Sequence, residues 1–187
     1  MAEYYFLPNI LRFAARSIWL VAFCYWICCG CSSKGNVAEI WQIGNKAFDV
    51  RVDAYSEKGV GFVRGAYYVF TAKPHDTSKW SEVMTFRHDD PVPIPREQIR
   101  FVTDKIGFIF MGWMYAVTTD AGQDWSVWDA RSDLANWECC NYGLINDVNL
   151  QPDGTGKMIL NPIEGRRGEV PKLCTRDFGR HWTNKCD

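Results

Sequence analysis

Short runs of alternating apolar and polar residues, separated by turn-forming residues, make up most of the chain. Phe48–Tyr55 alternates strictly, which is typical of a strand with one buried face, and residues 62–70 continue the sheet after a turn. Strand, turn and strand recur over residues 100–112 and again over 148–160, where Asp153–Gly154 is a hairpin turn. The pattern predicts antiparallel β-sheets.

The first 30 residues follow a different pattern. Arg12 and Arg16 precede an apolar run over residues 17–29, and the small residue Gly30 follows it. This order is typical of a secretory signal. A membrane-spanning helix needs about 20 apolar residues, and a longer run here would bury both arginines. We therefore predict a signal peptide over residues 1–30, with an uncleaved membrane anchor as the alternative.

The junction after this segment, Gly30-Cys31-Ser32, resembles the bacterial lipobox, in which the cysteine is lipidated and becomes the first mature residue. The family favours leucine and a small residue where this chain has Cys28 and Cys29. The resemblance implies lipidation of Cys31 and firm anchoring through several acyl chains. It also implies an outer-membrane lipoprotein facing the periplasm, with inner-membrane anchoring as the alternative.

An eight-residue pattern, T-x-D-x-G-x-x-W, occurs twice. Its fixed positions are Thr118, Asp120, Gly122, Trp125, Thr175, Asp177, Gly179 and Trp182. The pattern resembles the Asp box, or BNR repeat, of sialidases and related β-propellers. The resemblance implies structural roles: Asp and Thr side chains hydrogen-bond the turn backbone, glycine supplies a positive φ, and tryptophan packs between neighbouring sheets.

A degraded third copy is expected over residues 71–80, with Lys73 in place of the aspartate. Trp80, Trp125 and Trp182 would then be equivalent wedges between sheets. Their spacing fits four-stranded units of roughly 40–50 residues. Three such units are too few to close a propeller, which usually has about 4–8 blades.

The expected fold class is therefore all-β, with about three BNR-like antiparallel units packed as a partial-propeller or sandwich-like single domain. This domain is predicted over residues 46–187, after a linker over 31–45 and an N-terminal signal helix. The proline-rich stretch 89–95 is expected to be a bend between the first and second units, because proline is excluded from central strands.

Cysteine positions agree with an exported protein. After removal of the signal and lipidation of Cys31, an even number remains: Cys139, Cys140, Cys174 and Cys186. Adjacent cysteines in an extended chain point to opposite faces, so Cys139 and Cys140 are each expected to pair with a distant partner. Two bridges to Cys174 and Cys186 are predicted, with the connectivity open. The alternative, a four-cysteine zinc site, lacks the usual ligand spacing.

The net charge and the absence of catalytic motifs limit the classes of function that we expect. The 21 basic and 22 acidic residues nearly cancel, so nucleic acid is not an expected partner. The sequence has no G-x-S-x-G, H-E-x-x-H or P-loop motif, and three units cannot supply the arginine triad, tyrosine and acid of a sialidase. His75 and His181 are isolated, and His88 with two aspartates is interpreted as a solvated turn. We predict no enzyme activity, cofactor or metal.

A protein-binding role is the remaining expectation. Tryptophan, tyrosine and arginine dominate interface hot spots, which makes Trp113, Tyr115, Trp137, Arg166 and Arg167 candidates for partner contact. Core packing is the favoured interpretation of Trp113 and Tyr115, and a soluble hairpin loop is the alternative for the two arginines.

The general appearance of the chain, together with the segment Pro93–Trp125, resembles immunity lipoproteins that guard against type VI secreted phospholipases. The resemblance implies a protein that binds a toxin and covers its active site. Two alternatives are an assembly or stability factor for an envelope complex, as some BNR-repeat proteins are, and a glycan-binding module that uses Trp113 or Trp137 as a stacking platform.

Overall fold

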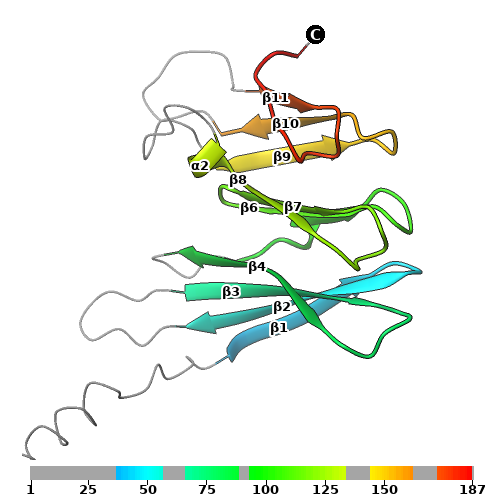
Figure 1. Cartoon of the computed structure of the whole chain (residues 1–187). Coiled ribbons are helices and arrows are strands. Elements are labelled where there is room, and N and C mark those ends of the chain that lie inside the picture. Colours follow the sequence, from blue (N-terminus) through cyan, green and yellow to red (C-terminus); the bar gives the residue numbers. More distant parts are fainter. Residues whose placement is uncertain (1–36, 57–65, 89–92, 134–143, 162–171, 187) are drawn as a thin grey trace, which may run out of the picture. The chain divides into compact units, whose positions relative to one another are not determined.

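The computed structural model describes residues 37–56, 66–88, 93–133, 144–161 and 172–186, all within one compact unit (Figure 1). Their secondary structure is almost entirely strand. The elements are β1 (Val37–Gly44), β2 (Phe48–Ser56), β3 (Ala66–Pro74), β4 (Ser81–His88), η1 (Arg96–Gln98), β5 (Ile99–Phe101), β6 (Gly107–Met111), β7 (Met114–Thr118), β8 (Ser126–Asp129), α2 (Ala130–Asp133), β9 (Ile145–Leu150), β10 (Gly156–Leu160) and β11 (Lys172–Thr175).

The strands form three antiparallel sheets, each made of strands that follow one another in the chain. The first sheet has the order β1-β2-β3-β4, the middle sheet β5-β6-β7-β8, and the last sheet β11-β10-β9. Beside β11, an isolated antiparallel bridge pairs Cys174 with Thr183, so the segment around Thr183 occupies the place of a fourth strand in the last sheet. The prediction of an all-β fold built from consecutive antiparallel units is confirmed.

The middle sheet has apolar contacts on both faces. β6 is buried along its whole length, and its side chains alternate between two cores. Phe108 and Phe110 belong to the core shared with the last sheet, whereas Ile109 and Met111 belong to the core shared with the first sheet. A strand buried on both faces is continuously apolar, which explains why β6 lacks the alternation seen in β2.

Each core is filled by large apolar side chains. The core between the first and middle sheets includes Phe48, Val50, Val52, Phe70, Met84 and Phe86. The core between the middle and last sheets includes Tyr115, Trp128, Val148, Met158, Leu160 and Trp182. The three sheets are therefore packed face to face in chain order, with the middle sheet as the shared layer (Figure 1).

The predicted linker over residues 31–45 is wrong for its second half. Residues 37–44 form β1, which pairs along β2 from Val37↔Tyr55 to Gly44↔Asp49. Trp41 and Ile43 are half-buried against the first core, whereas Gln42 is exposed. The apolar side chains on one face of this strand complete the first sheet, so the β domain begins before the predicted boundary at residue 46.

The third strand also differs from its expected position. Residues 62–65 lie outside the described part, and β3 continues through residue 74, so the degraded repeat begins inside a strand and its turn is shorter than predicted. The predicted signal helix and Cys31 lie outside the described residues as well. Among the described residues, none of the helices has the length and apolarity needed to span a membrane.

Candidate functional site

The first T-x-D-x-G-x-x-W segment forms the turn between β7 and β8. The Thr118 hydroxyl donates to Asp120 Oδ1 at 2.8 Å and accepts the N–H of Gly122 at 3.0 Å. The same carboxylate oxygen accepts the N–H groups of Gln123 at 3.1 Å and Asp124 at 3.0 Å. The two side chains thus take up the backbone donors that a tight turn leaves unpaired.

The second segment, between β11 and the bridge at Thr183, repeats this geometry. The Thr175 hydroxyl donates to Asp177 Oδ1 at 2.8 Å and accepts the N–H of Gly179 at 2.9 Å, and the N–H of His181 donates to Asp177 Oδ1 at 3.0 Å. Gly122 and Gly179 have φ values of 84° and 82°, in the region that favours glycine. Both turns join the third and fourth positions of a sheet, so their expected structural role fits the observed hydrogen bonds.

The two tryptophans of these turns pack between sheets. Trp182 is 6% exposed and meets Tyr115 edge-on, with ring centroids 5.4 Å apart, in the core between the middle and last sheets. Trp125 packs against Phe48, with centroids 6.0 Å apart, at the core between the first and middle sheets. Each tryptophan therefore contacts the sheet that precedes its own.

Trp80 was expected to pack between sheets as Trp125 and Trp182 do, and this prediction is wrong. Trp80 follows the turn between β3 and β4, the position that corresponds to the other two, but it belongs to neither of the two buried cores and is only half-buried. Its ring lies beneath the Lys73 ammonium, 5.1 Å from the centroid. The physical reason is that its sheet is the first of the three described, so no earlier described sheet is available for the indole to contact.

The second turn carries an exposed contact between a histidine and an aspartate. His181 Nδ1 contacts Asp177 Oδ2 at 2.5 Å, and the imidazole is 87% exposed. Partial burial favours a higher pKa for the Asp177 carboxyl, but hydrogen bonds from His181 and Thr175 outweigh it and lower the pKa below its usual value. Asp177 is thus held in its charged form as part of the turn.

Two predicted partner-binding residues are packing residues. Tyr115 is fully buried, its hydroxyl donates to the Phe178 carbonyl at 3.0 Å, and burial, with the nearby Asp177 charge, raises its pKa. The prediction that Tyr115 contacts a partner is therefore wrong. Trp113 is half-buried against Phe86, with centroids 4.8 Å apart, and the Arg131 guanidinium lies 4.2 Å from its ring centroid.

The remaining candidates, Trp137, Arg166 and Arg167, lie outside the described residues. Cys139 and Cys140 do as well, but the predicted pairing of each with Cys174 or Cys186 is wrong, because those two cysteines form a disulfide with each other. The backbone bridge between Cys174 and Thr183 turns the chain back along β11, which brings the Cα atoms of Cys174 and Cys186 to 5.4 Å.

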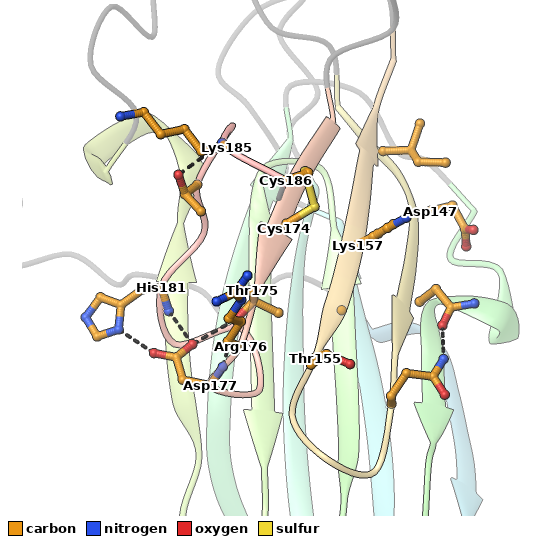
Figure 2. A pocket seen from close by; sticks show the side chains of 15 residues that line it. Asp147, Thr155, Lys157, Cys174, Thr175, Arg176, Asp177, His181, Lys185 and Cys186 are labelled. Carbon is orange, nitrogen blue, oxygen red and sulfur yellow. Dashed lines mark hydrogen bonds and ion pairs between the residues drawn. A yellow bond between two sulfur atoms is a disulfide. The ribbon is translucent and has the colours of Figure 1, made fainter.

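The outer face of the last sheet contains an open hollow of about 980 Å³ (Figure 2). It is lined by the outward side chains of β9 and β10, by residues at the end of β11, and by the second turn. The opposite face of this sheet is buried through Val148, Met158 and Leu173. We call this surface the terminal hollow; its polar lining includes Asn149, Gln151, Lys157, Arg176, Asp177 and Lys185.

Some of the charged side chains that line the terminal hollow have a partner, and others have none among the described residues. Asp147 is paired with Arg100, with Nη2 and Oδ1 2.7 Å apart, and Asp177 is hydrogen-bonded to the His181 side chain. Lys157, Arg176 and Lys185 have no ion-pair partner among the described residues. Within the described residues, the lining of the hollow therefore has more cations than carboxylates, and its only aromatic ring is the imidazole of His181.

The terminal hollow was not predicted from the sequence. Its only signal was the run of polar positions that alternate with buried ones over residues 145–160, and that run does not tell whether another sheet covers the polar face.

In the part of the chain that the structure describes, no three His, Cys, Asp or Glu side chains gather as a metal site. Comparisons with protein-family models, curated proteins and solved structures returned no match.

Proposed function

We propose that the protein is a non-enzymatic binding protein that uses the terminal hollow to hold a protein partner. The observation that supports this role is an open, polar concavity on one face of a sheet whose other face is fully packed. A surface fixed in this way loses little conformational freedom on binding, and such preorganisation favours affinity.

The repeated turns support an Asp-box assignment for the fold. Two turns with the same four residue types, the same hydrogen bonds and positive-φ glycines lie at corresponding positions of consecutive sheets. We infer that the domain is a partial propeller of three BNR-like units, with the boxes as structural parts at the edges of the sheets. In this assignment the repeated turns have a structural role, and the terminal hollow has the binding role.

The partner we propose is a toxin, such as a type VI secreted phospholipase, with the protein acting as its immunity protein. In this role the protein would face the periplasm as an outer-membrane lipoprotein anchored through Cys31. The Cys174–Cys186 disulfide supports an oxidising compartment, since such bonds are rare in the cytosol. A glycan-binding role has less support, because Arg131 and Phe86 contact the ring of Trp113.

The test is deletion of the gene followed by growth in contact with sister cells. We expect the deletion strain to be killed by toxin-delivering sister cells and to survive beside sister cells that lack the secretion system. The full-length gene should restore survival. A deletion strain that is no more sensitive than its parent would refute the immunity role, and loss of an envelope complex instead would indicate an assembly factor.

A further inference from the structure

We propose that the terminal hollow recognises an acidic segment of its protein partner. This inference rests on the proposed function and adds the chemistry by which the partner is bound. Its basis is the set of three cations, Lys157, Arg176 and Lys185, that line the hollow and have no ion-pair partner in the described part of the chain.

The positive charge is local to this face. The whole chain has a net charge of -1, so a general excess of basic residues does not account for it. Of the two carboxylates of the lining, Asp147 is paired with Arg100, and Asp177 accepts hydrogen bonds within its own turn from Thr175 and His181. The lining thus has three cations against two carboxylates, and none of the three cations has an ion-pair partner among the described residues. Complementary charge of this kind steers association and selects among partners.

The arrangement of the cations favours an extended segment over a small anion. Lys157 lies on β10, Arg176 follows β11, and Lys185 follows the second turn. In Figure 2, Lys185 and Lys157 lie on opposite sides of the disulfide, and Arg176 lies below it in the view, beside Thr175. Cations that come from three segments in this way match carboxylates spread along a chain, whereas a phosphate is usually held by donors that converge on one point.

Neutral groups in the hollow suit a peptide. Gln151 Nε2 donates to Asn149 Oδ1 at 2.6 Å, which leaves the Asn149 amide nitrogen as a donor and the Gln151 oxygen as an acceptor. A peptide backbone offers both kinds of group and can bond to each. A sugar ring would gain more from an aromatic platform, and the lining of this hollow offers none beyond His181.

The test measures binding of a fluorescently labelled, glutamate-rich peptide to the full chain in non-ionic detergent, with heparin and inorganic phosphate as competing probes. We expect the peptide to bind, and the double variant K157E/R176E to weaken binding about tenfold or more. The matched control K79E/K105E makes the same change in charge at exposed lysines in turns of the first and middle sheets, and it should bind as the unchanged chain does. The proposal would be overturned if both double variants lost peptide affinity equally, or if both bound the peptide as tightly as the unchanged chain. It would also be overturned if the protein bound heparin or phosphate in preference to the peptide.

Growth competition separates this inference from the proposed function. If K157E/R176E protects the deletion strain as well as the unchanged gene does, the immunity role holds and the acidic-segment proposal is wrong. If deletion has no effect on survival but peptide binding still depends on Lys157 and Arg176, the immunity role is wrong and the chemistry of the hollow holds.

Discussion

Replacing Trp182 with alanine should lower the free energy of unfolding by about 3–5 kcal/mol, the usual cost of removing a large aromatic side chain from a core. The indole is 6% exposed and contacts Tyr115 and Trp128 between the middle and last sheets, so its removal leaves a cavity that neither sheet can fill. Urea unfolding of the full chain, followed by circular dichroism, measures the change.

Trp80→Ala is the matched control for this prediction. Trp80 occupies the corresponding position of the first sheet but lies outside both cores and contacts the Lys73 ammonium. Its loss should cost less than about 1 kcal/mol, as for most partly exposed positions. Equal costs for the two substitutions would contradict the packing described for the last sheet.

Removing the disulfide with the double variant Cys174→Ala/Cys186→Ala should lower the free energy of unfolding by about 3 kcal/mol. The two cysteines are separated by 12 positions, and the loop they close contains the whole second turn. The bridge restricts this loop in the unfolded chain, and its loss returns that freedom to the unfolded state.

Reduction provides the control for the disulfide prediction. Dithiothreitol should shift the urea midpoint of the unchanged chain toward that of the double variant and should leave the double variant nearly unaffected. A double variant as stable as the unchanged chain would contradict the prediction. A further large shift of the double variant on reduction would show that a different disulfide provides the stabilisation.

Local patterns in the sequence predicted the repeating features of the fold well. The alternation in residues 48–55 corresponds to β2, and Asp153–Gly154 lies in the turn between β9 and β10, where Gly154 has a φ of 89°. The residue types of the two T-x-D-x-G-x-x-W segments predicted hydrogen bonds to the turn backbone. These features depend on neighbours within a few residues, so the sequence itself contains the information.

Features that depend on distant parts of the chain were not predictable in this way. Trp80 and Trp182 both follow the turn after the third strand of a sheet, but the burial of each indole depends on whether another sheet lies in front of its own. Cys174 pairs with Cys186 because a backbone bridge at Thr183 brings the two segments together. The terminal hollow likewise exists because the outer face of the last sheet is uncovered in the described structure, which the alternation of residues 145–160 does not reveal.

The middle and last sheets are closed by the same turn, in which a buried threonine hydroxyl accepts a glycine N–H. Amide hydrogen exchange of Gly122 and Gly179 in the full chain tests this most directly. We expect both amides to exchange far more slowly than in an unstructured chain, because each N–H is buried and bonded to a threonine, at 3.0 Å and 2.9 Å. Thr118→Val should speed exchange at Gly122 alone, and Thr175→Val at Gly179 alone. Exchange of either glycine at the rate of an unstructured chain would contradict the claim.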